Sequence, residues 1–170
     1  EARDVAVWFP RAKSFWGKAR SHTKAVDGVT LTLRQGQTLG VVGESGSGKS
    51  TLAMALLRLQ DCQGTLLFEG RDLQALKQSG LRPLRRHLQV VFQDPYGSLS
   101  PRLTVEEIVA EGLGVHRLAS SREDRAAKVA EALRSVGLEA DMAGRYPHEF
   151  SGGQRQRIAI ARALILEPKV

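Results

Sequence analysis

Eight consecutive residues carry the clearest chemistry in the sequence. They run from Gly43 to Ser50 and read Gly-Glu-Ser-Gly-Ser-Gly-Lys-Ser. Glycines let successive backbone N–H groups turn inward and approach a polyphosphate closely. Lys49 is placed to reach the β- and γ-phosphates, and the Ser50 hydroxyl is placed to ligate Mg²⁺. The segment therefore predicts a binding site for a nucleoside triphosphate.

A strand before this loop and a helix after it must position these groups. Residues 39–42 are apolar, and Leu52, Leu56 and Leu59 share one face of the helical pattern that follows the loop. The order strand, glycine-rich turn, helix distinguishes a phosphate-binding loop from a Gly/Ser-rich surface turn, which is the alternative interpretation. The N-terminus of such a helix adds partial positive charge beside the phosphates.

Composition restricts the class of protein. The 170 residues suffice for one domain with a core, and 42% apolar with 25% charged residues is ordinary for a globular protein. The sequence has neither a run of 18 apolar residues nor an N-terminal signal pattern, so we expect no membrane span and no secretion. A single cysteine, Cys62, excludes an internal disulfide framework and fits a reducing cytosol.

The formal net charge of +7 raises the possibility of a nucleic-acid partner. However, the basic residues are dispersed along the chain, and aromatic residues are not interleaved with them as in single-strand binding proteins. We therefore expect no nucleic-acid partner.

Strand patterns dominate up to about residue 92, and helical patterns run from about 104 to 166. Strands are predicted at residues 4–9, 29–33, 39–42, 64–69 and 88–92, with a loop over 10–24 and a turn at 35–36. This layout predicts a nucleotide-binding α/β core with a helical subdomain inserted after residue 93.

Capping signals mark the expected helix boundaries. Thr104 with Glu107 and Ser120 with Glu123 have the spacing of capping boxes. The apolar stripe of the second helix stops at Gly137, which is the expected C-cap. Two helices are therefore predicted after residues 104 and 120.

The second informative motif reads Ser-Gly-Gly-Gln-Arg-Gln-Arg over residues 151–157 and precedes a helical pattern. Its turn offers an anion a hydroxyl, unhindered backbone N–H groups and the positive end of a helix. The alternative is an N-capped core helix that buries Ile158, Ile160, Ala161 and Leu164. Together with the phosphate-binding loop, the motif resembles the signature of ABC-type ATPases.

Other segments make the resemblance narrower. Residues 93–102, Gln-Asp-Pro-Tyr-Gly-Ser-Leu-Ser-Pro-Arg, are similar to the ATPase subunits of oligopeptide, dipeptide and nickel importers. So are residues 25–29, 42–50 and 146–150, although Phe150 stands where many members have leucine. The similarity runs from Val5 to Pro168.

The resemblance implies a fold, two cofactors and a set of site residues. The fold is α/β, a P-loop ATPase core with an antiparallel β subdomain and an inserted α-helical subdomain carrying the signature. Within one cassette, residues 1–93 form the core and β subdomain, 94–150 the helical subdomain, and 151–170 the signature and its helix. The cofactors are ATP and Mg²⁺, with Lys49 and Gln93 catalytic and Ser50 and Gln93 on the metal.

The nucleotide-binding residues implied by the resemblance come from two motifs. The phosphate-binding loop contributes Gly43, Glu44, Ser45, Gly46, Ser47, Gly48, Lys49, Ser50 and Thr51. The signature contributes, in trans, Ser151, Gly152, Gly153 and Gln154. The adenine-stacking aromatic is expected shortly before Ala25, where Phe15, Trp16 and His22 are candidates and Trp16 is favoured. The alternative for Phe15 and Trp16 is packing onto their own loop.

The implied function is ATP hydrolysis that energises uptake of peptides or related solutes at the cytoplasmic face of the bacterial inner membrane. The implied partners are a second ATPase domain in a head-to-tail dimer, transmembrane permease subunits and, indirectly, a solute-binding protein. A fused double ATPase remains open, as does the solute. One alternative is an ABC-type ATPase of DNA repair or chromosome structure, which the absence of a long heptad segment between the motifs disfavours. Another is a non-catalytic nucleotide-binding module.

In the family, an apolar strand ending in Asp, a catalytic Glu and a switch His follow the signature helix, and this sequence contains none of them. The sequence is therefore expected to be truncated before that strand and inactive by itself. Loss of a central strand should leave an unpaired edge and a partly exposed core face.

Overall fold

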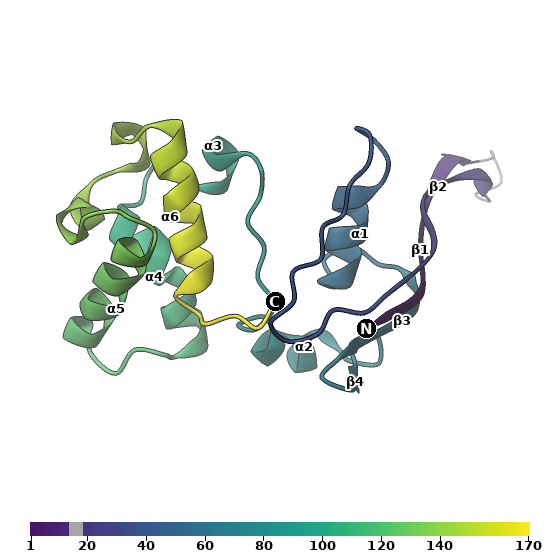
Figure 1. The fold of residues 1–170 in the computed structure, drawn as a ribbon, viewed down its shortest axis with the longest axis horizontal. Coiled ribbons are helices and arrows are strands. Elements are labelled where there is room, and N and C mark those ends of the chain that lie inside the picture. Colours follow the sequence, from purple (N-terminus) through teal and green to yellow (C-terminus); the bar gives the residue numbers. More distant parts are fainter. Residues whose placement is uncertain (14–18) are drawn as a thin grey trace. The chain divides into compact units, whose positions relative to one another are not determined.

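The computed structural model describes residues 1–13 and 19–170 in two compact units, residues 1–81 and 82–170 (Figure 1). Each unit has buried apolar residues of its own. The subdomain boundaries predicted at residues 93 and 150 remain predictions.

An antiparallel sheet forms most of the first unit. Its strands are β1 (Ala2–Lys13), β2 (Ala19–Leu31), β3 (Gln63–Phe68) and β4 (Arg71–Asp72), in the order β2-β1-β3-β4. Glu69 and Gly70 connect β3 to β4 with φ of 51° and 77°, the left-handed pair that a two-residue hairpin turn requires. The hairpin places β4 at the edge of the sheet.

The predicted loop over residues 10–24 was largely wrong. β1 continues to Lys13 and β2 begins at Ala19, and Pro10 lies opposite His22 in the ladder. Proline lacks an N–H donor and often ends a strand, which is consistent with a strand predicted only to residue 9. Pairing of the two long strands carries the ladder past it.

The predicted strand at residues 39–42 was also wrong. No ladder includes these residues in the described part of the chain, and Val42 is 92% exposed. A parallel strand takes its hydrogen bonds from neighbouring strands, so an apolar run becomes a strand only where such neighbours exist. Residues 39–42 therefore form an extended lead into the phosphate-binding loop.

Residues 88–92 likewise form no strand, contrary to the prediction of a buried one. Val91 and Phe92 are exposed. The His87 carbonyl accepts hydrogen bonds from the Lys169 and Val170 amides, and the Gln89 amide donates to the Val170 carbonyl, each near 3.0 Å. This alternation is that of a parallel pair. This pairing reaches only Gln89, so the rest of the apolar run, including Val91 and Phe92, has no strand beside it among the residues that the structure describes and stays exposed.

Helices make up most of the second unit. The helices of the chain are α1 (Lys49–Leu56), α2 (Gln78–Leu84), α3 (Pro95–Ser98), α4 (Val105–His116), α5 (Arg122–Ser135) and α6 (Gly152–Leu164). Two 3₁₀ turns, Ala140–Gly144 and Pro147–Glu149, precede α6. In the second unit α4, α5 and α6 pack around one apolar core whose most buried members include Val105, Ile108, Leu113, Leu133 and Ile158.

The caps of these helices follow local sequence chemistry. The Thr104–Glu107 capping box at the start of α4 is confirmed, and the Thr104 amide donates to Glu107 Oε2 at 2.7 Å. Hydrogen bonds from the Thr104 amide and hydroxyl hold the pKa of Glu107 below its usual value. The cap predicted at Ser120 was wrong by one residue, because Ser121 caps α5.

Gly137 ends α5 as predicted. Its φ is 72°, its amide donates to the Arg134 carbonyl, and the Leu138 amide donates to the Leu133 carbonyl. These two bonds make a Schellman motif, which satisfies carbonyls that the helix end leaves open. Leu133 and Leu138 are both buried beside it.

Candidate functional site

The phosphate-binding loop leads directly into α1, and Gly48 is the junction. Gly48 has φ of 90°, and a Cβ placed on it would lie 2.1 Å from the Ala25 carbonyl oxygen. Any side chain there would collide with the backbone of β2 as well as strain the turn. Glycine at this position lets α1 begin in contact with the sheet.

Lys49 is directed into the loop. Its Nζ donates to the Gly43 carbonyl at 2.8 Å, to the Glu44 carbonyl at 2.6 Å and to the Ser47 Oγ at 3.3 Å. These contacts hold the ammonium group on the inner side of the loop, where a phosphate oxygen could exchange with the carbonyls. The geometry thus provides one positioned positive charge for a polyphosphate.

The first turn of α1 adds backbone donors. Lys49, Ser50 and Thr51 begin the helix, and the first N–H groups of a helix have no partner within it. No acidic side chain lies in this turn, so the chain itself does not neutralise the positive end of the helix. The turn can therefore accept an anion next to Lys49.

Mg²⁺ fits the oxygen donors of the predicted metal residues. Ser50 contributes a hydroxyl at the exposed start of α1, and Gln93 contributes an exposed amide oxygen. Hard oxygen donors suit Mg²⁺, which usually keeps several waters and binds substrate phosphates. The described residues contain no cluster of three or more His, Cys, Asp or Glu for a metal ion. The phosphates would thus supply much of the coordination.

The aromatic candidates for stacking on adenine differ in whether the structure describes them and whether their rings already have partners. Phe15 and Trp16 lie outside the described residues, and the His22 ring lies 6.4 Å from the Trp8 ring in a tilted arrangement. Trp8 is already engaged, because its Nε1 donates to Asp27 Oδ1 at 3.3 Å and Lys24 Nζ lies 4.8 Å from its ring centre.

Phe9 is an aromatic residue that the sequence interpretation missed. Val7 pairs with Val26 across the sheet, and the Val26 side chain lies beside Gly48. Phe9 follows Val7 by two residues in β1, pairs with Thr23 of β2 after a register shift of the ladder, and is 39% exposed. An exposed aromatic two residues after a buried valine was the available signal.

The signature motif forms the start of α6. Ser151 Oγ accepts from the Gln154 amide at 3.3 Å, and the Ser151 amide donates to Gln154 Oε1 at 3.0 Å, which completes a capping box. A hydroxyl that accepts one bond can still donate its own hydrogen. Both interpretations of the motif are therefore compatible at Ser151.

The burial predicted for α6 holds only in part. Ile158 and Ala161 are fully buried, but Ile160 is half-buried and Leu164 is 45% exposed. Leu164 is not part of the core cluster, although Leu166 two residues later is, and it lines an open groove instead, which accounts for its exposure.

Arginines anchor α6 to its neighbours in the helical unit. Arg155 Nε donates to the Pro147 carbonyl at 2.7 Å, and Arg162 Nη1 donates to the Ser98 carbonyl at 2.7 Å. The second bond ties α6 to α3, the short helix that begins two residues after Gln93. The signature helix and the segment following Gln93 are therefore mechanically linked.

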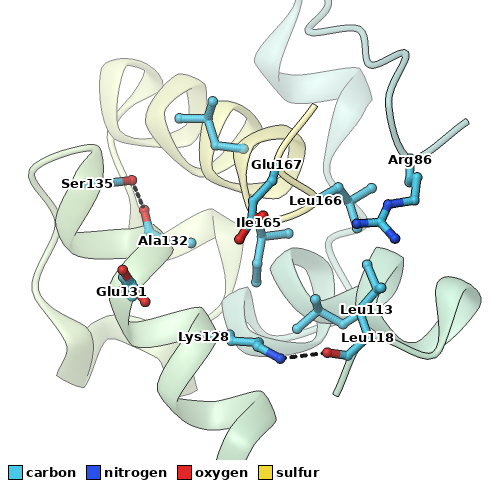
Figure 2. Close-up of a pocket in the computed structure, with 11 residues that line it drawn as sticks. Arg86, Leu113, Leu118, Lys128, Glu131, Ala132, Ser135, Ile165, Leu166 and Glu167 are labelled. Atoms are coloured by element: carbon cyan, nitrogen blue, oxygen red, sulfur yellow. Dashed lines mark hydrogen bonds between the residues drawn. The ribbon is translucent and has the colours of Figure 1, made fainter. Parts of the chain in front are cut away.

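A groove of the helical unit lies apart from these motifs within that unit (Figure 2). It measures about 410 Å³ and has an apolar floor that includes Leu113 and Leu166. Its charged lining contains both signs, with Arg86 and Lys128 opposed by Glu131 and Glu167. None of the predicted site residues lines it.

A loop that presents a lysine and helix N–H groups to a phosphate, in a chain that also carries the signature turn, defines a nucleotide-binding ATPase cassette. The chain belongs to the ABC transporter family, whose sequence profile matches residues 26–170. The peptidoglycan transport ATP-binding protein YejF of Agrobacterium fabrum is 56% identical over 98% of the chain and 30% of its own length. The dipeptide transport ATP-binding protein DppF of Lactococcus lactis is 53% identical over 99% of the chain and 53% of its own length.

A solved structure shows the same fold. The dimeric ABC transporter cassette MJ0796 superposes with a TM-score of 0.83 at 31% identity, covering 98% of this chain and 69% of that one. This likeness confirms the predicted class, a P-loop ATPase fold with an antiparallel sheet and helices. The chain spans about a third to about a half of the length of these two curated relatives.

Proposed function

We propose that the chain is the nucleotide-binding part of an ATPase subunit that energises uptake of peptides or related small solutes. The observation that carries the proposal is Lys49, held inside the phosphate-binding loop by three donated hydrogen bonds at the start of α1. The solute class rests on the relatives, which are named for transport of peptidoglycan and dipeptides.

Catalysis in such a site is positioning and charge neutralisation. Lys49 and the first N–H groups of α1 would bind the β- and γ-phosphates, and Ser50 and Gln93 would each offer an oxygen to the metal. Mg²⁺, when bound, neutralises developing phosphate charge. Ser151 donates its hydroxyl hydrogen, and Gly152 and Gly153 present N–H groups, to the γ-phosphate of a second cassette. The dimeric relative of known structure supports this trans arrangement.

An ATPase of DNA repair or chromosome structure gains no support. Between the two motifs the longest helix is α5, with 14 residues. A coiled-coil arm needs at least three or four heptads. The inserted segment is instead a compact helical unit.

Steady-state phosphate release tests the proposed activity. A protein extended to the length of the curated relatives should hydrolyse ATP, whereas the 170-residue chain should be slower by about 10²- to 10⁴-fold, the usual effect of losing a general base. A matched extended variant with Lys49→Ala measures background. Equal turnover by the chain and the extended protein would show that the catalytic groups are misassigned.

We infer that the partner in the membrane docks on residues 93–113, at the cytoplasmic face of the bacterial inner membrane. None of the helices that the structure describes is long and apolar enough to cross a membrane. Leu103 is exposed, and the bond from Arg162 to Ser98 connects this region to the signature helix. Docking there would couple movement of the signature to a permease subunit.

Cysteine crosslinking tests the docking surface. In an extended protein without Cys62, cysteines replacing Ser98 and Leu103 should capture a permease subunit. A cysteine replacing Arg134, on the exposed end of α5, serves as the control and should not. Equal capture from all three positions would contradict a defined surface.

We propose Phe9 as the adenine platform, beside the earlier prediction of Trp16. Phe9→Ala should weaken ATP binding by about tenfold, because aromatic–base stacking contributes roughly 1–3 kcal/mol. The control is Trp8→Ala, since Trp8 is engaged by Asp27 and Lys24. Titration of both variants and of Trp16→Ala with ATP identifies the stacking residue. A loss of ATP affinity confined to Trp16→Ala would assign the platform to Trp16 instead.

A further inference from the structure

A second hollow in the helical unit is lined by three arginines and by no acidic side chain. It lies where α4 ends and α5 begins and measures about 390 Å³. Arg117, Arg122 and Arg125 line it, with Ser120 and Ser121 between them. We call it the arginine hollow. The groove of Figure 2 differs, because carboxylates share its lining with the cations.

The two carboxylates at the start of α5, Glu123 and Asp124, are engaged by local hydrogen bonds, whereas Glu106 of α4 faces Arg125 as an ion pair. Asp124 Oδ2 accepts from the Ser120 amide at 2.8 Å and from Lys128 Nζ at 3.1 Å, and these bonds lower the pKa of Asp124. Hydrogen bonds from its own amide and from Ser121 lower the pKa of Glu123. Glu123 and Asp124 thus already neutralise the positive end of α5. A further anion would therefore be attracted by the guanidinium groups and not by the helix N-terminus.

Arg125 has a donor that the fold leaves unused. Its Nε is buried and has no hydrogen-bond partner among the described residues. Glu106 Oε1 pairs with it electrostatically at 4.0 Å, a distance too long for a hydrogen bond. A buried donor without a partner is costly, and an anion in the hollow would supply one.

The α4–α5 connection positions the other two arginines. Arg117 follows α4 in the left-handed conformation, with φ of 55° and ψ of 46°, and Arg122 is the first residue of α5. Left-handed backbone is unfavourable for a residue with a side chain. Arg117 nevertheless ends α4 there, and its side chain lines the hollow opposite the start of α5.

We propose that the arginine hollow binds a phosphate group, either free or in the headgroup of an anionic lipid. Guanidinium forks match phosphate oxygens with paired, charge-assisted hydrogen bonds. Three such groups without an opposing lining carboxylate favour a dianion over a single carboxylate. The site is separate from the phosphate-binding loop and does not depend on the proposed transport function.

Phosphate titration of the 170-residue chain tests this site. Lys49→Ala is included throughout, so that the phosphate-binding loop does not dominate the signal. The amide signals of Ser120–Arg122 and the Arg125 Nε–H signal are followed by NMR. Inorganic phosphate should shift them saturably, and Arg125→Gln should weaken binding about tenfold, the effect of losing one charge-assisted bond.

The matched control is Arg134→Gln, which removes the same charge at the other end of α5 and should change affinity less than twofold. Arg125→Lys keeps the charge but loses the fork, and should fall between wild type and Arg125→Gln. Unchanged amide spectra outside the hollow establish that each variant folds. Equal weakening by Arg125→Gln and Arg134→Gln, or shifts that never saturate, would overturn the proposal.

Vesicles separate the two sources of phosphate. Cosedimentation with phosphatidic acid vesicles but not phosphatidylcholine vesicles, abolished by Arg125→Gln alone, would assign a lipid headgroup. Saturable binding of inorganic phosphate without cosedimentation would assign a soluble phosphate. Binding to neither probe would refute the site.

Discussion

Replacing Lys49 with alanine is expected to weaken ATP binding by about a hundredfold. The ammonium group donates to three acceptors inside the loop, so it is held within the segment that we propose binds the β- and γ-phosphates. A hydrogen bond to a charged group contributes roughly 1.5–3 kcal/mol, and a tenfold change in affinity corresponds to about 1.4 kcal/mol. Calorimetric titration of the 170-residue chain with ATP and Mg²⁺ measures the change.

Lys77→Ala is the control for Lys49→Ala, because Lys77 is an exposed lysine of the same unit and its loss changes the net charge equally. Folding should be little affected by Lys49→Ala, since the Gly43 and Glu44 carbonyls it releases are exposed and can bind water. The urea midpoint of the variant checks this. Equal ATP affinity in wild type and Lys49→Ala would remove the phosphate-binding role of the loop.

Features set by neighbouring residues were predictable from the sequence. The capping box at Thr104 and the end of α5 at Gly137 each depend on a few consecutive residues, and both are confirmed. The one-residue error at α5 has a local cause. Ser120 and Ser121 can both cap a helix, and the Asp124 carboxylate takes the Ser120 amide and hydroxyl, which leaves Ser121 as the cap.

Features set by distant pairing were predictable only in part, because the strands predicted at 4–9, 29–33 and 64–69 overlap β1, β2 and β3 whereas two others do not form. Residues 39–42 and 88–92 have strand-like sequences, but a strand needs partners that are remote in the chain. Conversely, β1 runs past Pro10 because β2 lies beside it.

The same distinction applies to the site. The phosphate-binding loop and the signature are contiguous motifs, so their residue types could be identified without the fold. The proposed platform at Phe9 could not be identified in this way, because Phe9 belongs to no contiguous motif and its exposure is set by the pairing of β1 with β2. Pro10 directly follows Phe9 and made it look like the last residue of an ordinary strand.

In a protein of the relatives' length, Gly153→Asp should reduce ATP hydrolysis by at least about 10²- to 10³-fold and leave ATP binding by the monomer nearly unchanged. The size is that of losing one donor contact in a transition state, because the added carboxylate would keep the γ-phosphate away from the N–H groups of the signature. An aspartate at this position would place a negative charge against the γ-phosphate held by a second cassette.

The structure makes Gly153→Asp a clean test of action in trans. A Cβ at Gly153 would meet no atom within 4 Å, and its φ lies outside the left-handed region. Gly153 is in the first turn of α6, where an acidic side chain favours the helix. Ser151→Arg should also stop hydrolysis, but it removes the N-cap and costs roughly 1 kcal/mol of stability. Gly153→Asp therefore separates catalysis from folding better than Ser151→Arg does.

Gly144→Asp is the matched control, because Gly144 also has open space around it and lies in the 3₁₀ turn ahead of the signature. It adds the same charge to the same unit and should leave turnover unchanged. Phosphate release and ATP titration are measured on both variants. If Gly153→Asp lowers ATP affinity of the monomer as much as turnover, the signature contacts nucleotide within its own chain and the head-to-tail arrangement is wrong. If both aspartates slow turnover equally, the effect is one of overall charge, and the signature has no special place at the γ-phosphate.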